Sequence, residues 1–302
     1  MISSNGGTAK ATGLVVLSAC CFGSLTTLTL FVTRAGLPLL PAMVWRYSLA
    51  AIALVLIARR PILQSGITKG QAARLMLIGG CGQAVITYLS LRALDYLPVG
   101  PLGFLFYTYP AWVVVIAAMT GKEELTFVRL AALAIAMAGI TVMVGTPFSE
   151  PLNATGVMLA LGTAVLYALY LPALHSVQQG VTSVAATFYL VSGVCISFVI
   201  AGAVTGTLQM PDTPRIWALL IALSLIGTVL AFISLLAGLQ VLGPVRTSII
   251  ATVEPFFTAM LGVVLLGERF SMTMLSGGAL IAAAVLLIQW AGRTRSDLEP
   301  SV

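Results

Sequence analysis

Residues 248–270 read SIIATVEPFFTAMLGVVLLGERF, an apolar run long enough to cross a bilayer that nevertheless contains a glutamate followed at once by a proline. Residues 103–125, GFLFYTYPAWVVVIAAMTGKEEL, repeat this layout. Pro110 and Pro255 are 145 positions apart, whereas Tyr109 stands where the later stretch has its first glutamate. The two stretches therefore predict an internal repeat of membrane-spanning helices whose copies differ at one ionisable position.

Composition indicates a membrane protein. The 302 residues are 59% hydrophobic and 8% charged, whereas soluble domains carry about 25% charged residues. A helix needs about 20 mostly apolar residues to cross the hydrocarbon core. We therefore expect an all-α integral membrane protein with ten transmembrane helices, a first helix that is retained after Lys10, and no soluble domain. The expected spans are residues 12–33, 39–58, 72–94, 98–120, 126–145, 154–174, 183–206, 215–240, 244–266 and 272–292.

The repeat divides the ten spans into two sets of five. The triplet Ala-Thr-Gly at 11–13, where the first span begins, recurs at 154–156, where the sixth begins. Because five is an odd number, the second set must enter the membrane with the opposite orientation. Inverted repeats are a common build for secondary transporters, whose substrate site lies near the midplane between the halves. We expect two inverted five-helix repeats, residues 1–148 and 149–302, around a central cavity in one transmembrane unit.

The charge distribution indicates membrane topology and argues against a nucleic-acid partner. The net charge is +6, but the basic residues are scattered over short loops and form no continuous patch. With a cytoplasmic N-terminus, ten Lys and Arg residues fall inside, four fall outside and Arg46 lies within the second span. This bias follows the positive-inside rule. We expect a monomeric, multi-pass protein of the bacterial inner membrane with both termini in the cytoplasm.

The sequence lacks the motifs of a cofactor-dependent or metal-dependent enzyme. All four cysteines fall within expected spans, as suits reduced thiols, and no pair shows zinc-ligand spacing. His175 is the single histidine, which excludes a histidine-rich metal site. We find no phosphate-binding glycine loop, dinucleotide fingerprint or nucleophile elbow. We expect no cofactor, no metal and no catalytic residue; the expected partners are the lipid bilayer and a small-molecule solute.

Several motifs recur at matched places and carry a family resemblance. They are Glu254-Pro255 with Leu266-Gly267-Glu268-Arg269-Phe270, the weaker first copy Tyr109-Pro110 with Lys122-Glu123-Glu124-Leu125, and Arg46 early in the second span. Over essentially its whole length the chain resembles the EamA-type ten-helix branch of the drug/metabolite transporter superfamily, and it looks most like the aromatic amino acid exporters. The resemblance implies a helical bundle with a central cavity that exports amino acids or related metabolites by alternating access. Because Tyr109 replaces the glutamate, a symmetric pair of carboxylates is not expected.

Glu254 lies near mid-membrane. It is about ten residues into the ninth span, roughly 15 Å deep at ~1.5 Å per residue. A carboxylate at this depth is costly, so we expect it to face a cavity, where it contacts solute or carries a proton. Thr247, Glu254 and Thr258 follow helical spacing and form a polar stripe on an apolar helix. The alternative is a structural carboxyl group bonded to backbone that Pro255 leaves unpaired.

Arg46 lies ~5 residues into the second span, about 7 to 8 Å from its outer end. Its side chain could snorkel to the membrane interface. If it points inward instead, its planar fork suits a substrate carboxylate or a partner such as Glu254. The sequence leaves both readings open.

Pro110 and Pro255 remove helical hydrogen bonds at equivalent places in the two halves. A pair of matched helix breaks points to the transport site of a repeat transporter. We expect the two prolines to act as hinges; kinks that only shape packing are the alternative.

Aromatic and polar side chains gather on three of the expected spans. A cavity lined by rings and hydroxyl groups would suit an aromatic or amphipathic solute. Tyr and Trp are also common at membrane interfaces and in packing, which remains the alternative for each of them. The candidate solute contacts are Gln83, Thr87 and Tyr88 in the third span, Tyr107 and Trp112 in the fourth, Thr163, Tyr167 and Tyr170 in the sixth, and Thr258 in the ninth.

His175 follows Pro172 at the end of the sixth span. A histidine can titrate near neutral pH, so this side chain is a candidate for a gate or, together with Glu254, for a proton path. A helix-end or headgroup contact is the alternative.

These observations predict a secondary transporter that exports small metabolites, amino acids with aromatic ones preferred. One alternative is an exchanger of sugar phosphates or nucleotide sugars, but dianionic phosphates demand basic clamps and only Arg46 lies clearly within a span. Another is a membrane-embedded enzyme, for which one histidine and one intramembrane carboxylate are a poor set of catalytic groups.

Overall fold

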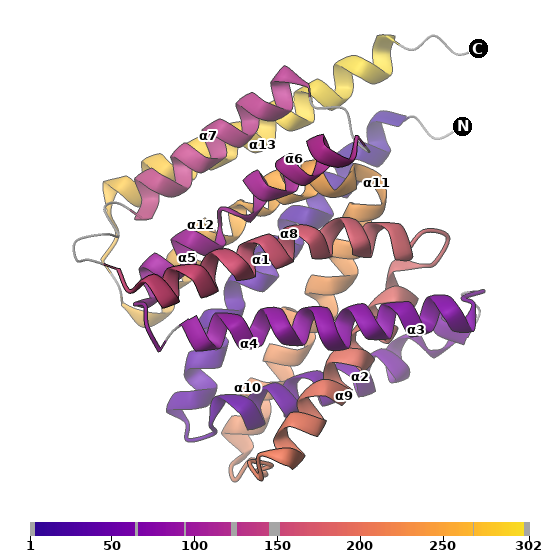
Figure 1. Ribbon diagram of the computed structural model, residues 1–302, viewed down its shortest axis with the longest axis vertical. Helices are drawn as coiled ribbons and strands as arrows, with labels where there is room; N and C mark the ends of the chain where they lie inside the picture. Colours follow the sequence, from indigo (N-terminus) through magenta and orange to yellow (C-terminus); the bar gives the residue numbers. More distant parts are fainter. Residues whose placement is uncertain are drawn as a thin grey trace.

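The protein is a bundle of helices (Figure 1). The computed structural model describes residues 4–63, 66–93, 95–121, 126–144, 152–267 and 269–298, and these contain no strand. The expected repeat boundary at 148, the motif at 122–125 and Glu268 lie outside the described residues. The helices are α1 (Ser4–Arg34), α2 (Leu39–Leu63), α3 (Lys69–Leu77), η1 (Ile78–Gln83), α4 (Ala84–Ala93), α5 (Val99–Phe106), α6 (Tyr109–Thr120), α7 (Phe127–Val144), α8 (Ala154–Val177), α9 (Ser183–Val204), α10 (Pro214–Ser224), η2 (Leu225–Leu230), α11 (Ala231–Ala251), α12 (Val253–Leu266) and α13 (Met272–Leu298).

Ten spans are present in the described part of the chain, as expected. Nine helical stretches are long and apolar enough to cross a membrane, and one of them, Pro214–Ala251, joins two spans without a loop. The join is a sharp break at Gly243, whose φ of 74° and ψ of 170° are not helical. Pro244 then starts the ninth span, because proline is tolerated in the first turn of a helix. Most expected span ends are confirmed to within a few residues, whereas α1 begins eight residues before the expected start at 12 and α13 continues six residues beyond the expected end at 292.

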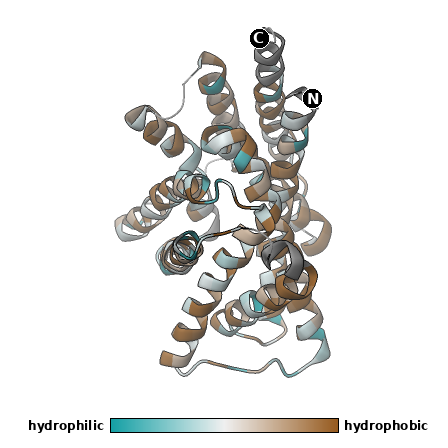
Figure 2. Ribbon diagram, turned by 90° about the vertical axis from the view of Figure 1, so that its right-hand side faces the viewer, coloured by the Kyte–Doolittle hydropathy of each residue, from teal (hydrophilic) through white to brown (hydrophobic). Residues whose placement is uncertain are grey.

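The outer surface of the bundle is apolar. Hydrophobic residues appear along both sides of most helices in Figure 2, and large apolar side chains such as Leu56, Met119 and Val204 are about four-fifths exposed, at 77%, 82% and 81%. Soluble proteins rarely expose contiguous apolar surface of this kind. The described surface is therefore suited to contact with lipid.

The fourth and ninth spans are interrupted at equivalent places. Proline has no N–H group and its ring clashes with the carbonyl group four residues earlier. The first half-helix of the fourth span ends at Phe106, four residues before Pro110, and that of the ninth span ends at Ala251, four residues before Pro255. Both prolines then lie in the first turn of the second half-helix. The expected helix breaks are confirmed, while the role of the two prolines as hinges stays a prediction.

The third and eighth spans each contain a π-helical segment that the sequence did not reveal. Ile78–Gln83 interrupts the third span and Leu225–Leu230 interrupts the eighth, and their first residues are 147 positions apart. π-Helical turns are rare in proteins, and those that occur are often at functional sites. Matched π segments and matched breaks show that the repeat extends to irregular features of the backbone.

The helices pair as an inverted repeat requires. The first span, α1, packs along α11 of the eighth, and the equivalent sixth span, α8, packs along α4 of the third (Figure 1). The second and seventh spans, α2 and α9, pack on each other, as do the fifth and tenth, α7 and α13. Exchanging the two repeats turns the pair of the first and eighth spans into the pair of the sixth and third, and leaves the other two pairs unchanged. This is the pattern expected of two repeats related by a pseudo-two-fold axis.

Replacing Gly139 by alanine is expected to loosen the packing of α7 against α13. A methyl group on Gly139 would lie 2.7 Å from the carbonyl oxygen of Gly277 and 2.9 Å from Cγ1 of Ile281. Overpacking of this kind costs about 1–3 kcal/mol, so Tm of the detergent-solubilised protein should fall. Gly162→Ala is the matched control, because nothing lies within 4 Å of its added methyl group. An equal Tm for the two variants would contradict this packing.

Candidate functional site

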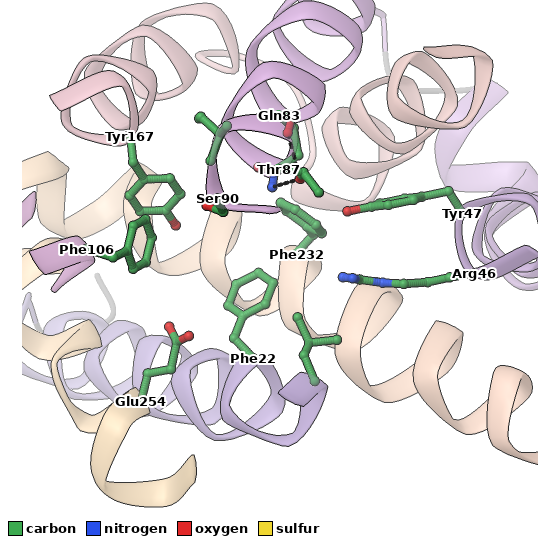
Figure 3. Close-up of a pocket in the computed structure, with 12 residues that line it drawn as sticks. Phe22, Arg46, Tyr47, Gln83, Thr87, Ser90, Phe106, Tyr167, Phe232 and Glu254 are labelled. Carbon is green, nitrogen blue, oxygen red and sulfur yellow. Dashed lines mark hydrogen bonds between the residues drawn. The ribbon is translucent and has the colours of Figure 1, made fainter. Parts of the chain in front are cut away.

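A cavity of about 230 Å³ lies between the two repeats (Figure 3). The cavity is lined by the middle of α8, the end of α5 and the first turns of α11 and α12. The halves of the first three spans that lie away from the termini complete the lining. The cavity is small compared with ligand pockets of about 300–1,000 Å³. Its size therefore suits a small metabolite. The lining residues are Phe22, Leu25, Arg46, Tyr47, Gln83, Ile86, Thr87, Ser90, Phe106, Tyr167, Phe232 and Glu254.

Opposite charges stand at the two sides of this cavity. Figure 3 shows Glu254 and Arg46 on opposite sides, with Phe22 and Phe232 between them. Neither charged side chain has an ion-pair partner in the described part of the chain, where the ion pair found joins Arg92 to an aspartate at the surface. Buried charges are stabilised mainly by pairing and hydrogen bonds. The cavity thus holds one positive and one negative group that a bound solute can pair.

Glu254 is placed by the break in the ninth span. It lies in the first turn of α12, where the N-terminus of a helix favours negative charge. The Tyr107 hydroxyl donates to Oε1 of Glu254 at 3.4 Å. Thr258 donates to the carbonyl oxygen of Glu254 at 3.0 Å and to that of Gly23 at 3.2 Å, which ties α12 to α1. Of the two readings of Glu254, the structure supports the one in which its carboxyl group faces a cavity.

Arg46 points inward and does not snorkel. Its side chain is 7% exposed. Nε donates to the Thr228 hydroxyl at 2.7 Å, Nη2 donates to the carbonyl oxygen of Gly227 at 3.1 Å, and the guanidinium carbon lies 4.7 Å from the centre of the Tyr47 ring. These contacts hold the guanidinium group flat at the cavity wall, between the π segment of the eighth span and an aromatic ring.

Aromatic side chains form much of the wall between the two charges. Phe22 meets Phe232 edge to face at 5.2 Å between ring centres. Tyr167 lies 5.5 Å from Phe106 and 4.8 Å from Tyr109. Rings arranged in this way offer faces and edges on which an aromatic or aliphatic side chain can pack.

One side of the cavity is polar and comes from a single helical face. Gln83, Thr87 and Ser90 are four and three residues apart and line the cavity together. The Thr87 hydroxyl donates to the carbonyl oxygen of Gln83 at 2.8 Å and accepts from Nε2 of Gln83 at 3.5 Å. This side supplies neutral donors and acceptors beside the charged groups.

The candidate residues divide by position. Glu254, Arg46, Gln83, Thr87 and Tyr167 line the cavity. Tyr107 contacts Glu254 from outside the lining. The remaining candidates Thr163, Tyr170 and Thr258 do not line it: the Thr163 hydroxyl donates to Leu159 of its own helix, Tyr170 is buried behind Tyr167, and Thr258 joins α12 to α1.

Tyr88 and Trp112 are not part of the central cavity, unlike the aromatic candidate Tyr167. They are 61% and 37% exposed. Tyr88 is five residues after Gln83, which turns it about 140° away from the polar face of α4 at 3.6 residues per turn. Neither side chain is on the part of its helix that lines the central cavity.

Sequence reasoning missed more than half of the lining residues. The apolar residues gave no signal, because an apolar residue in a transmembrane helix can face lipid, neighbouring helices or a cavity. Ser90 could have been found from its helical spacing to Gln83, and Tyr47 from its place beside Arg46. The lining residues that were not candidates are Phe22, Leu25, Tyr47, Ile86, Ser90, Phe106 and Phe232.

A second cavity of about 1040 Å³ opens at the end of the bundle that carries the termini. His175 lies here, and its Nδ1 donates to the carbonyl oxygen of Leu239 at 2.9 Å while Gln179 contacts its other ring nitrogen at 3.3 Å. Gly243 and Pro244, at the break between the eighth and ninth spans, also line this cavity. His175 is eight residues along α8 from Tyr167, which lines the central cavity, so His175 and Glu254 line different cavities.

Comparison with known families is consistent with this architecture. The model of the EamA-like transporter family matches residues 9–145 and 154–290. The chain belongs to the EamA-like transporter family. The two matched segments start 145 positions apart and end 145 positions apart, which is the spacing of Pro110 and Pro255. The expected two-repeat organisation of an EamA transporter is therefore confirmed.

Individual relatives support the same assignment. An "Uncharacterized transporter" of Archaeoglobus fulgidus is 24% identical over 280 residues, which cover 90% of this chain and 94% of that protein. The "Uncharacterized transporter YcbK" of Bacillus subtilis is 24% identical over 288 residues, or 89% of each chain. A solved crystal structure with 18% identity superposes with a TM-score of 0.73 over 95% of this chain and 99% of its own. This last likeness shows that the two proteins share a fold.

Proposed function

We propose that this EamA transporter carries amino acids, aromatic ones included, across the bacterial inner membrane as an exporter. One observation carries the proposal: a single small cavity holds Arg46 on one side and Glu254 on the other, neither of them ion-paired among the described residues. An amino acid has a carboxylate and an ammonium group of the matching signs. The phenyl rings between the two charges provide surface for its side chain.

The charge of the cavity disfavours phosphorylated solutes. Sugar phosphates and nucleotide sugars bring two or more negative charges, which proteins bind with several basic groups. Arg46 is the cation among the lining residues, and Glu254 opposes any second anionic group. A solute with no net charge fits this balance better than a dianion.

The cavity does not support a membrane-embedded enzyme. Catalysis requires convergent groups that serve as nucleophile, base or electrophile. The lining residues include one carboxylate and neither histidine nor cysteine, and no cluster of three or more potential metal ligands occurs in the described part of the chain. Transport accounts for the site without a reaction.

Two cavities at opposite depths of the bundle support a mechanism of alternating access. The first three spans contribute to the central cavity from their halves away from the termini, and the larger cavity lies at the end of the bundle that carries the termini. With both termini in the cytoplasm, this arrangement corresponds to a state in which the central cavity is separated from the cytoplasmic one, because the two share no lining residue. Bending at the breaks before Pro110 and Pro255 would let the half-helices move and join the central cavity to the cytoplasmic one.

Two glutamines support the closed cytoplasmic side. Nε2 of Gln71 donates to the carbonyl oxygens of Val177 and Gln179 at 2.8 and 2.9 Å. Nε2 of Gln240 donates to that of Val181 at 2.7 Å. The third and eighth spans therefore hold the turn between the sixth and seventh. We call Gln71 and Gln240 the glutamine clasp.

Buried polar groups near the clasp lack partners in this state. Both amide atoms of Gln178 and the Thr247 hydroxyl are buried and have no hydrogen-bond partner among the described residues. A threonine in a helix often bonds the carbonyl group four residues earlier, but for Thr247 that residue is the non-helical Gly243. Unpaired buried polar groups cost about 1–3 kcal/mol each. Hydration of these groups would favour a state that opens at this end.

Removing the clasp is expected to open the cytoplasmic side more often. In a variant without the four native cysteines, a cysteine in place of Thr247 is buried in the closed state. Gln71→Leu with Gln240→Leu should raise the labelling rate of this cysteine by a water-soluble maleimide added from the cytoplasmic side about 100-fold. The reason is that at least three hydrogen bonds of about 1 kcal/mol each are lost. Labelling that stays unchanged in the double variant would contradict the role of the clasp.

The experiment that tests the substrate class is flux in proteoliposomes. Labelled phenylalanine, threonine and a hexose phosphate are each supplied with and without a pH gradient. The proposal predicts saturable flux of the amino acids and none of the phosphate, and a response to the gradient would add proton coupling. Flux of the phosphate without the amino acids would overturn the proposed substrate class.

A further inference from the structure

The π segment of the eighth span frees a backbone carbonyl oxygen that would accept a hydrogen bond within a regular α-helix. In an α-helix the N–H of Ala231 would donate to the carbonyl oxygen of Gly227. Here it donates to Ile226 and Thr228 instead. The carbonyl oxygen of Gly227 is released from Ala231 and accepts Nη2 of Arg46 at 3.1 Å. The change of helical register therefore creates one of the two acceptors that hold this arginine.

The equivalent segment of the first repeat does the same with a neutral partner. The N–H of Ala84 donates to Cys81, which releases the carbonyl oxygen of Gly80. That oxygen accepts the hydroxyl group of Ser197, on the seventh span, at 2.9 Å. The seventh span is the counterpart of the second, which carries Arg46. The two repeats share one backbone feature, and the second repeat uses it to hold a charge.

Two hydrogen bonds of Arg46 to the π segment occupy the edge of the guanidinium group formed by Nε and Nη2. A guanidinium carries five N–H donors in a fixed plane. Nε and one N–H of Nη2 bind Thr228 and Gly227, and Nη1 contacts the sulfur of Met43 at 3.8 Å. One N–H remains on each terminal nitrogen, along the edge opposite Nε. This pair of parallel donors is the arrangement that binds a carboxylate through both oxygens.

We propose that Thr228, together with the released carbonyl group of Gly227, positions Arg46 so that its outer edge meets the carboxylate of the transported solute. This inference rests on the proposed function. Thr228 is fully buried at 0% exposure and does not line the cavity, so it acts through Arg46. Selection for a carboxylate thus depends on a residue that the solute does not touch.

The test compares a solute that has the carboxylate with one that lacks it. Flux of labelled phenylalanine is measured in proteoliposomes, with unlabelled phenylalanine or phenethylamine as competitor. Thr228→Val keeps the side-chain shape and removes the acceptor for Nε. It is expected to raise KM for phenylalanine about tenfold, because a hydrogen bond to a charged group is lost, while the maximal rate and competition by phenethylamine stay unchanged. Thr228→Ser, which keeps the hydroxyl group, should restore the KM of the unmodified protein.

Two further variants separate the possible failures. Ser197→Ala removes the matched contact in the first repeat and should leave the preference for phenylalanine over phenethylamine intact. Equal weakening of both solutes by Thr228→Val, or no recovery with serine, would overturn the positioning role. If Arg46→Gln abolishes the preference for phenylalanine over phenethylamine while Thr228→Val does not alter it, the positioning role of Thr228 is wrong and the proposed function stands. If Arg46→Gln leaves this preference intact, Arg46 does not bind the carboxylate, and both the positioning role of Thr228 and the proposed function are wrong.

Discussion

Glu254→Gln is expected to reduce saturable phenylalanine flux about 100-fold, because losing one partner of a buried charge pair costs about 3 kcal/mol or more. The amide keeps the size of the side chain and can still accept from Tyr107. It cannot pair with the ammonium group of the solute or bind and release a proton. The loss should therefore appear in flux with and without a pH gradient, while Tm changes little.

Asp95→Asn is the matched control for this change. Asp95 forms a surface ion pair with Arg92 at 2.7 Å, and both side chains are about half exposed. Exposed pairs contribute about 0–1 kcal/mol, so flux should be unaffected. Full flux in Glu254→Gln would mean that this carboxyl group is structural and that the cavity does not use it.

Arg46→Gln is expected to raise KM for phenylalanine about 100-fold, since the cation that pairs the carboxylate is lost inside a low-dielectric cavity. Tm should also fall, because the Thr228 hydroxyl and the Gly227 carbonyl group lose their donor. Arg46→Lys should not restore transport. A lysine ammonium is a point charge and cannot bind both π-segment acceptors and a carboxylate in one plane.

Arg92→Gln supplies the comparison for the loss of one positive charge at a surface position. It should change neither KM nor Tm by a measurable amount. Recovery of phenylalanine KM in Arg46→Lys would contradict bidentate recognition, because it would show that charge alone is sufficient.

The regular part of the fold could be predicted from the sequence because lipid imposes a simple rule. Each span must be an apolar helix of about 20 residues, so the ten spans and their ends followed from composition alone. The matched Pro110 and Pro255 also predicted the interrupted helices, since the chemistry of proline acts locally. Glu254 was found because a carboxylate in an apolar run is conspicuous.

The irregular features depend on contacts that no local pattern encodes. The π segments leave no trace in hydropathy, and their partners Arg46 and Ser197 lie on helices far away in the sequence. The face that each aromatic residue presents was equally hidden, as Tyr88 shows, because lipid and cavity accept similar side chains. The break at Gly243 joined two spans without a polar loop, although its Gly-Pro pair marked the place.

The central claim is that one cavity binds a solute through its carboxylate at Arg46 and its ammonium group at Glu254. The most direct measurement is competition against labelled phenylalanine flux in proteoliposomes by phenethylamine, which lacks the carboxylate, and by 3-phenylpropionate, which lacks the ammonium group. Each analogue loses one charge pair, and the account predicts that both compete at least about tenfold more weakly than unlabelled phenylalanine. If either analogue competes as well as phenylalanine, the solute is not held between these two charges.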